Sequence, residues 1–344
     1  MNQQAAIIAQ IQAAMRQSFP PYEASVAEFY GMQEYHLGWR DLELQPAHAD
    51  PGKLLRPQLT MLACQACGGD PAQALPLAAG IQLMHDFSLI HDDIQDQSDT
   101  RRGRTTVWAH WGIAQGINAG DGMFVLAHLA VQRLADVGVP AATVLAILRR
   151  FDEIILAVCE GQYLDLSFEG DLSIITDDYL AMIERKTAAL IAGAAGLGGL
   201  VAGLSAEAAA PLFAFGRNIG LAFQVQDDLL GIWGDPAMTG KPAAADLYRR
   251  KLSLPVVYAL SNSSERDELV FRYLSDNNDS EAIQRMLMIL TTAGAYDYCT
   301  EIAQHYHEQA LQQLAQVPIA ASEPAHAALA RIRAVAEQLP GRRT

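Results

Sequence analysis

Hydrophobic residues along most of the chain recur at intervals of three and four positions, the spacing of a helix that buries one face. The pattern covers residues 53–67, 73–96, 115–136, 141–168, 176–204 and 206–230, with shorter stretches between 252 and 338. Pro140, Pro211, Pro255 and the pair Gly68 and Gly69 lie at or near segment ends, where helix-breaking residues belong. Alternating β-branched runs are nearly absent. The pattern predicts an all-α protein of ten or more helices.

Only residues 45–52 and 231–245 are typical of longer loops, and no repeat or low-complexity linker divides the chain. We therefore predict a single helical domain over residues 1–344. The composition agrees with this, because 51% of the residues are hydrophobic, 18% are charged and 7% are aromatic. Such a chain suits a large, closely packed helical core and excludes a disordered protein.

Charge narrows the classes of partner. Lys and Arg number 24 against 39 Asp and Glu, a formal net charge of −15. An acidic chain repels polyanions, so we expect neither nucleic acid nor an anionic membrane surface as a partner. Should the substrate carry phosphates, nearby basic residues or a divalent cation must reverse the local field.

Four cysteines are too few for a disulfide scaffold, and the pair Cys64 and Cys67 lacks the second pair that a zinc site needs. The N-terminal residues do not show the basic and apolar regions of a signal peptide. Residues 187–206 are uncharged but rich in Ala and Gly, which predicts a buried helix rather than a membrane span. We expect a cytoplasmic protein without stable membrane insertion.

The segment LIHDDIQDQSDTRRGRTTVW ends a long apolar helix with a cluster of carboxylates. Asp92 and Asp96 are four residues apart and share one helix face, with Asp93 beside them. Carboxylates packed this closely repel one another unless a cation is present, and oxygen ligands select magnesium or manganese. The arginines that follow suit anionic oxygens; they are Arg101, Arg102 and Arg104. Together they predict a diphosphate site, with a solvated acidic helix end as the alternative.

A second acidic pair closes another apolar helix in LAFQVQDDLLGIWGDPAMTGKPAAADL. Asp227 and Asp228 follow Phe223 and Gln224, and basic residues come later at Lys241 and Lys251. Two such pairs on separate helices could hold metal ions in one cavity.

Five motifs in this order resemble the trans-isoprenyl diphosphate synthases, or polyprenyl synthetases, over residues 45–260. They are GKLLRP, HDFSLIHDDIQD with RRG, NAGD at 118–121, ERKTAAL, and FQVQDDLLG with GDP and TGKP. The resemblance implies an isoprenoid-synthase-type helical bundle around a central cavity, and a homodimer. It implies that the enzyme joins isopentenyl diphosphate to an allylic diphosphate: the allylic carbon–oxygen bond ionises, the isopentenyl double bond attacks the cation, and a proton leaves.

The family's roles transfer to matching positions. Three magnesium ions per site, or manganese, would be held by Asp92, Asp93, Asp96, Asp227 and Asp228. The allylic diphosphate would lie on Arg101, Lys186, Lys241 and Lys251. Isopentenyl diphosphate would lie on Lys53, Arg56, His85 and Arg102. The developing cation would face the oxygens of Thr187 and Gln224. The residues that would act directly in the reaction are Asp92, Asp93, Asp96, Arg101, Lys186, Thr187, Gln224, Asp227 and Lys241.

Product length in this family depends on side chains below the first acidic motif. Phe87, five residues before Asp92, should block the growing tail, while Ser88 beside it is small and Met84 one turn deeper is flexible. This pattern resembles short-chain geranylgeranyl diphosphate synthases, with farnesyl diphosphate as the alternative product.

Two positions depart from the family pattern. Leu54 stands where a further Arg is usual, which predicts weaker isopentenyl diphosphate binding, and Gly231 stands where the second motif normally ends in a third Asp. Asp235 could reach that motif only if the helix continued past Gly231. The Leu54 and Gly231 departures leave a regulatory subunit of a heteromeric synthase as an alternative. A class I terpene cyclase, which shares the metal chemistry but needs no second basic pocket, is another alternative.

Overall fold

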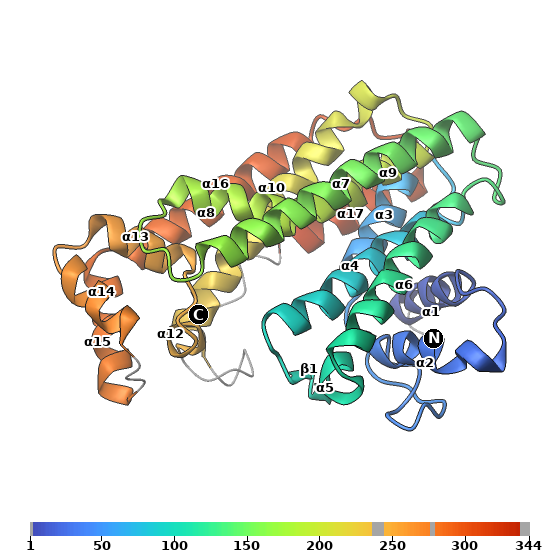
Figure 1. The fold of residues 1–344 in the computed structure, drawn as a ribbon. Coiled ribbons are helices and arrows are strands. Elements are labelled where there is room, and N and C mark those ends of the chain that lie inside the picture. Colours follow the sequence, from blue (N-terminus) through green and yellow to red (C-terminus); the bar gives the residue numbers. More distant parts are fainter. Residues whose placement is uncertain (1–2, 236–243, 276–278, 338–344) are drawn as a thin grey trace. The chain divides into compact units, whose positions relative to one another are not determined.

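The computed structural model describes residues 3–235, 244–275 and 279–337 (Figure 1). The chain divides into two compact units, which are described separately below. Unit 1 comprises residues 1–152, 197–206 and 319–328, and unit 2 comprises residues 153–196, 207–318 and 329–344. The all-α prediction is confirmed: the described residues form helices and one small two-stranded sheet. A single domain over the whole chain stays a prediction.

Unit 1 contains the N-terminal helices, the sheet and the beginning of α7. Its elements are α1 (Gln3–Arg16), η1 (Ala24–Val26), α2 (Ala27–His36), α3 (Leu55–Ala66), α4 (Leu75–Gln95), β1 (Thr100–Arg101), β2 (Arg104–Thr105), α5 (Val107–Trp111) and α6 (Ile113–Gln132). The helix α7 (Ala141–Phe168) continues into unit 2.

Unit 2 contains most of the remaining helices. They are α8 (Thr176–Ile183), η2 (Glu184–Ala188), α9 (Ala189–Val201), α10 (Ala206–Trp233), α12 (Ala245–Tyr248), α13 (Leu254–Asn262), α14 (Arg266–Leu274), α15 (Ser280–Thr292) and α16 (Ala295–Leu314). The end of α9, the first residue of α10 and the start of α17 (Glu323–Glu337) belong to unit 1.

The long apolar segments match helices closely, with two exceptions. The expected helix over residues 176–204 is interrupted by η2, a single π-helical turn between α8 and α9. The predicted loop at 231–245 was wrong at its start, because α10 continues through Gly231 to Trp233. Gly231 therefore lies inside a helix.

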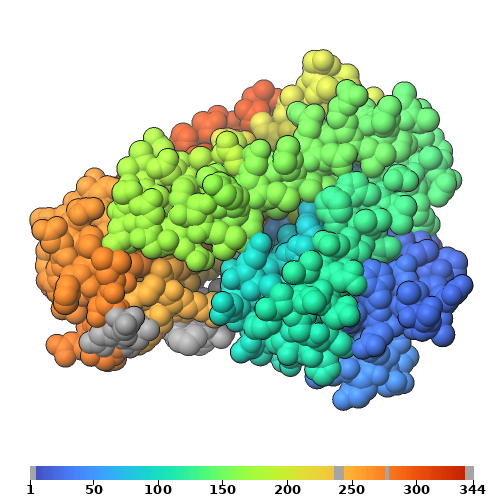
Figure 2. Space-filling view, viewed as in Figure 1, coloured from blue at the N-terminus to red at the C-terminus, as the bar shows by residue number. Residues whose placement is uncertain are grey.

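In unit 1, α4 packs against α1, α3 and α6. Gly80 allows the close approach of α4 to α6, because a Cβ there would lie 2.5 Å from a methyl carbon of Val131. A second small core joins α2 to α5 and α6 through Met32, Tyr35 and Val107. Figure 2 shows the teal atoms of α5 and α6 lying against the blue N-terminal helices. This packing fixes the carboxyl end of α4, where the first acidic motif lies.

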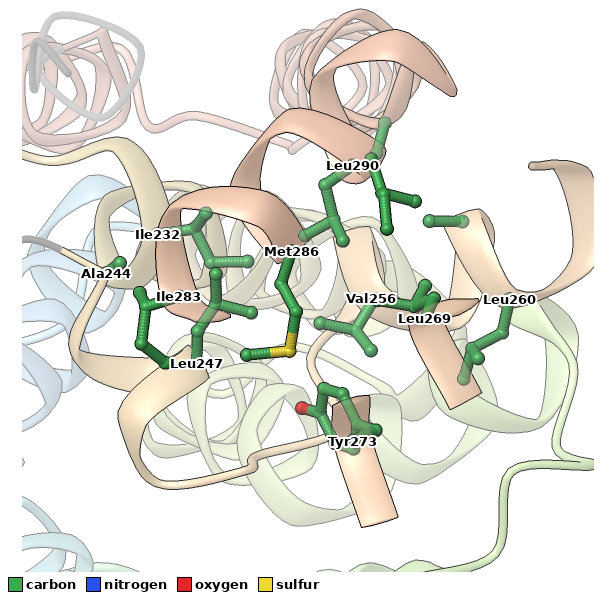
Figure 3. Close-up of a cluster of buried hydrophobic side chains, with 13 residues drawn as sticks. Ile232, Ala244, Leu247, Val256, Leu260, Leu269, Tyr273, Ile283, Met286 and Leu290 are labelled. Carbon is green, nitrogen blue, oxygen red and sulfur yellow. The ribbon is translucent and has the colours of Figure 1, made fainter. Parts of the chain in front are cut away.

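In unit 2, one core cluster gathers apolar side chains of α10, α12, α13, α14 and α15. Met286 occupies its middle, among Ile283, Val256 and Tyr273 (Figure 3). An adjoining cluster joins α8, α10, α13 and α16. Burial of these apolar surfaces stabilises the helices that carry the second acidic motif.

Within the described residues, no helix combines the length and apolar character needed to cross a membrane. All four cysteines are free thiols, and burial raises the pKa of Cys64 to about 12 and of Cys67 to about 11. Both thiols therefore stay protonated at neutral pH, and neither is a ready metal ligand.

Candidate active site

The first acidic motif lies at the carboxyl end of α4, where it meets the β1–β2 hairpin. The Arg101 side chain reaches back from β1, and its Nε donates to Asp93 Oδ1 at 2.8 Å. Its Nη2 donates to Asp92 Oδ2 at 3.2 Å. The Asp93 side chain is 3% exposed and that of Asp92 is 20% exposed, whereas Asp96 is exposed at the helix end. The guanidinium thus neutralises the pair in the ligand-free protein.

The hairpin that carries Arg101 has a two-residue turn in which Arg102 (φ 52°) and Gly103 (φ 72°) both adopt the left-handed conformation. This is the turn geometry that matches the twist of paired strands. The Thr106 hydroxyl donates to Ser98 O at 2.8 Å, and the Tyr35 hydroxyl of α2 donates to Thr105 O at 2.7 Å. These bonds hold the hairpin against α4 and α2, so the arginines are positioned before a ligand arrives.

The first motif suits a hard cation. Burial raises the pKa of Asp93 to about 6, while Arg101 opposes the rise and the neighbouring carboxylates add to it. Among residues 3–235, 244–275 and 279–337, no three acidic, histidine or cysteine side chains are arranged to hold one ion. Magnesium usually takes one or two carboxylates and completes its shell with water and substrate phosphate oxygens. Two or three carboxylates beside arginines fit an ion of that kind.

Four residues predicted to bind isopentenyl diphosphate come from α4, the hairpin and the start of α3. Arg56 Nη1 donates to His85 Nε2 at 3.3 Å, and this acceptor role requires an unprotonated Nε2 because a guanidinium only donates. Burial, with Arg56 and Arg102 next in effect, lowers the pKa of His85 well below its usual range. Arg102 lies beside Gly52, and Lys53, which follows it, is exposed.

These groups form a basic cluster without a full set of partners. Arg56 Nε is buried and has no hydrogen-bond partner among the described residues. Burial lowers the pKa of Arg56 to about 10, with Arg102 adding to the effect and Asp86 opposing it. A buried donor without an acceptor is costly, so an incoming anion that accepts this hydrogen bond gains affinity.

Leu54, one of the departures from the family pattern, is buried beside this cluster. It adopts φ 44° before α3 and lines a cavity of about 260 Å³ in unit 1. The cavity is also lined by His36, Asp86 and Arg104. The Leu54 side chain therefore fills interior space, and an Arg at this position would put another charge beside three arginines.

The residues predicted to limit product length lie on the α4 surface that packs against α6. The Phe87 ring contacts the rings of Phe124, at 5.2 Å between centroids, and His91, at 4.8 Å, both edge to face. Ser88 donates to His85 O at 2.8 Å, and Met84 is fully buried. Aromatic contacts of this geometry fix the orientation of the Phe87 ring.

The NAGD motif of α6 receives His91, the residue before the first acidic pair. A Cβ on Gly120 would lie 2.2 Å from His91 Nε2, so only glycine leaves room for this ring. The same nitrogen donates to Ile117 O at 3.1 Å and lies 3.7 Å from Asp121 Oδ1. His91 therefore anchors α4 to α6.

In unit 2, the ERKTAAL motif forms the π-helical turn η2. Gly161 of α7 lets the backbone of η2 pack closely against α7, because a Cβ at position 161 would lie 2.2 Å from the backbone nitrogen of Lys186. Lys186 forms an ion pair with Asp165, also from α7. The Thr187 hydroxyl donates to Gln224 Oε1 on α10 at 2.9 Å. The two oxygens predicted to face the developing cation thus lie together. Single π-helical turns are frequent at functional sites.

The second acidic pair on α10 has one buried and one half-buried member. Asp228 is fully buried, and its Oδ2 accepts from the Tyr179 hydroxyl at 2.6 Å and from Leu254 N at 3.4 Å. Its Oδ1 accepts from Gln224 Nε2 at 3.2 Å and lies 3.5 Å from Lys251 Nζ. Burial raises the pKa of Asp228, while Lys251, Tyr179 and Gln224 oppose the rise.

Asp227 differs from its neighbour. It is half-buried, and its carboxylate makes no hydrogen bond or ion pair with any residue that the structure describes. Burial opposes protonation of Lys251, but Asp228, Asp246, Asp227 and Asp165 outweigh it and raise the pKa of this lysine. Lys241, also predicted to bind the allylic diphosphate, lies outside the described residues.

Sequence reasoning did not identify four residues that complete these networks: Asp86, Asp165, Tyr179 and Asp246. Asp86 is the one with a signal in the sequence, because it interrupts the apolar stripe that α4 buries. The other three become visible only when separate helices meet. Asp165 pairs with Lys186, and Tyr179 binds Asp228.

Comparison with known proteins agrees with these features. Residues 44–290 match the polyprenyl synthetase family. A (2E,6E)-farnesyl diphosphate synthase and a geranylgeranyl diphosphate synthase, both from Mycobacterium tuberculosis, are each 39% identical to this chain. The first alignment covers 83% of this chain and 79% of the relative, and the second covers 88% and 85%.

Solved structures agree as well. A polyprenyl synthetase from Streptomyces coelicolor has a TM-score of 0.85 at 32% identity and covers 96% of both chains. A geranylgeranyl pyrophosphate synthetase from Pyrococcus horikoshii has a TM-score of 0.85 at 30% identity, covering 98% of this chain and 97% of the other. The chain therefore belongs to the polyprenyl synthetase family. It is a prenyltransferase with the all-helical fold of these enzymes.

Proposed function

We propose that the protein condenses isopentenyl diphosphate with allylic diphosphates and releases geranylgeranyl diphosphate. The observation that carries the product assignment is the Phe87 ring, held edge to face against Phe124 near the first acidic motif. Similarity alone does not select a product, because farnesyl and geranylgeranyl synthases are equally similar to this chain. A fixed bulky ring supports a short product, and Met84 below it allows some extension.

The basic cluster supports isopentenyl diphosphate as the second substrate. Lys53, Arg56 and Arg102 would bind its diphosphate, whose oxygens would accept the hydrogen bond that Arg56 Nε lacks. His85 would remain neutral beside them. A terpene cyclase needs no such second anion site.

Magnesium fits the acidic motifs, and Asp92, Asp96 and Asp227 are the ligands we propose first. When bound, magnesium would neutralise the leaving diphosphate. Asp93 and Asp228 were predicted as ligands too, but protein donors already occupy their buried carboxylates. Arg101, Lys186 and Lys251 would bind the allylic diphosphate. Thr187 and Gln224 would present their oxygens to the developing cation.

The test is a product assay on the full chain. The protein receives magnesium, isopentenyl diphosphate and, separately, dimethylallyl, geranyl or farnesyl diphosphate, and mass spectrometry sizes the dephosphorylated products. We expect a twenty-carbon alcohol that disappears with a chelator. Phe87→Ala should lengthen the product, whereas Phe271→Ala, an exposed ring on α14, should not. A cyclic hydrocarbon from one allylic substrate would indicate a cyclase, and no turnover would favour a regulatory subunit.

A homodimer is part of the same proposal. Ile113, Ile117, Val125 and Leu129 are exposed at multiples of four residues along α6. Such a row forms a ridge that packs into the grooves of a second helix. Light scattering should give twice the mass of 37.3 kDa, and Val125→Glu should reduce it to the monomer. A cytoplasmic location is consistent with four free cysteines.

A further inference from the structure

A row of four rings crosses unit 1 from α4 through α6 to α7. The Phe87 ring contacts the ring of Phe124, whose centroid lies 4.6 Å from that of His128. The His128 ring in turn contacts the fully buried Phe151 of α7, edge to face at 5.4 Å. The ring that limits the product in the proposed function therefore depends on the packing of two further helices.

Two hydrogen bonds fix the His128 ring within this row. Its Nδ1 donates to Phe124 O at 2.9 Å, and its Nε2 donates to Asp152 Oδ1 of α7 at 2.8 Å. A carbonyl oxygen and an ionised carboxylate only accept, so both ring nitrogens carry a proton and the ring is positively charged. Hydrogen bonds with a charged donor are stronger than neutral ones. The ring therefore cannot turn aside without losing both bonds.

His128 lies one helical turn further from the first acidic motif than Phe124. The helices α4 and α6 run antiparallel, as three contacts show: His91 with Gly120, Phe87 with Phe124, and Gly80 with Val131. Rising residue numbers on α6 thus lead away from the acidic motif. Because Phe124 contacts both Phe87 and His128, a tail that displaces Phe87 must also move a ring that His128 supports.

We propose that His128, anchored by Asp152, is a positioning residue for product length. It supports the Phe124 ring on the side away from the acidic motif, and so keeps the Phe87 barrier closed to a longer tail. The proposal rests on the proposed prenyl-elongating function. Closely packed rings leave little space for an added isoprene unit, whereas loss of the His128 ring opens space into which Phe124 can move. The competing explanation is that His128 and Asp152 only tie α6 to α7.

Product length distinguishes the two explanations, because the ratio of products does not depend on how much of the enzyme is folded. The readout is the ratio of longer alcohols to the main wild-type alcohol. His128→Ala should raise this ratio about tenfold. His128→Phe, which refills the space with a ring, should return it to within about threefold of the wild type. Asp152→Ala should raise the ratio less than His128→Ala does, because the bond to Phe124 O remains.

A control and a second measurement complete the test. His305→Ala, which removes an exposed histidine on α16, should leave the product ratio unchanged. Calorimetry with magnesium and unreactive thiolo analogues of prenyl diphosphates measures the discrimination between tails without turnover. The wild type should bind the twenty-five-carbon analogue about tenfold more weakly than the twenty-carbon one, and His128→Ala should reduce the difference to about threefold or less.

The outcomes separate this inference from the proposed function. Wild-type product ratios and wild-type tail discrimination in folded His128→Ala would overturn the inference and leave the ion pair as a tie between helices. Asp152→Ala decides in the same way if His128→Ala does not fold, and melting curves check the folding of both. Should the wild type make no prenyl product while its discrimination between tails still depends on His128, the proposed function fails and this inference stands.

Discussion

The two acidic pairs solve the same electrostatic problem in different ways. In each pair the second carboxylate is the more buried and is held by protein donors: Asp93 by Arg101, and Asp228 by Tyr179, Gln224 and Lys251. The first carboxylate is more open in both pairs. The comparison divides each pair into an anchor and a candidate ligand.

The pairs differ in what neutralises them. Arg101 contacts both Asp92 and Asp93, so a single cation from the hairpin covers the first pair. Among the described residues, the donors to the second pair contact Asp228 and not Asp227. A metal ion arriving at the first pair must therefore compete with a guanidinium, whereas no described donor contacts the Asp227 carboxylate.

The largest expected effect is on activity at Asp227. Asp227→Asn should lower kcat by about 10²- to 10³-fold, the loss typical when one group that stabilises transition-state charge is removed. The melting temperature should stay within about 2 °C of the wild type, because the side chain makes no hydrogen bond or ion pair with the described residues. Steady-state assays and calorimetry measure the two effects. Equal losses of activity and stability would refute the assignment of Asp227 as a ligand.

Asp228→Asn should show the reverse of Asp227→Asn, with its main effect on stability. It changes the acceptor of several hydrogen bonds at a fully buried site, so we expect a loss of about 2–3 kcal/mol in the free energy of unfolding. Tyr179→Phe, which removes one donor to the same carboxylate, should lose about 1–2 kcal/mol. Urea unfolding measures both. Wild-type stability in Asp228→Asn would break the distinction between anchor and ligand.

A third buried carboxylate, Asp86, predicts a pH dependence in unit 1. Burial raises its pKa from 3.8 to about 6, although Gln82, Arg102, Arg56 and Arg101 oppose the rise, and His36 lies 3.8 Å away. Because the folded protein holds this proton more tightly than the unfolded chain, ionisation costs stability as the pH rises from about 4 to 6.

Asp86→Asn removes that cost. The free energy of unfolding of Asp86→Asn, minus that of the wild type, should increase by about 3 kcal/mol between pH 4 and pH 7. This follows from about 1.36 kcal/mol for each unit of pKa difference. Urea unfolding at several pH values measures the change, with Asp136→Asn, an exposed carboxylate, as the control. A difference that is constant with pH would show that Asp86 has the same pKa in the folded and the unfolded protein.

The smallest effect concerns Arg101. Arg101→Gln removes the cation from Asp92 and Asp93, so the affinity for magnesium alone should rise about fivefold, equivalent to about 1 kcal/mol. The affinity for inorganic diphosphate in the presence of magnesium should fall, because a predicted anion contact is lost. Titration calorimetry follows both. If the affinity for magnesium alone and the affinity for diphosphate changed in the same direction, Arg101 would not compete with the metal.

Much of the fold follows from the hydrophobic pattern. The segment 141–168 coincides with α7, and 73–96 differs from α4 by one or two residues at each end. Their buried faces repeat regularly, so the period is clear. The pattern did not predict α1 and α2, and α2 buries adjacent residues such as Met32 and Gln33 rather than a regular stripe. The π-helical turn depends on Gly161 of another helix, which no local pattern encodes.

The site was predictable to the extent that its residues stand in ordered motifs. Arg56, His85 and Arg102 were grouped from the resemblance, and the structure places them together. Tyr179 lies on a different helix from Asp228 and reaches it through tertiary packing, and Asp246 approaches Gly231 of α10 from α12. In the sequence, Gly231 stands where the family pattern has a third Asp. In the structure, the absence of a side chain at this position leaves room for the Asp246 carboxylate.

A crystal structure with magnesium and inorganic diphosphate would test the division into anchors and ligands most directly. We predict that Asp92 and Asp227 contact magnesium at about 2.1 Å, the usual distance to oxygen. Asp228 should keep its hydrogen bond from Tyr179 and its contact with Lys251. Magnesium bound to Asp228, with the Tyr179 hydroxyl turned away, would contradict the account.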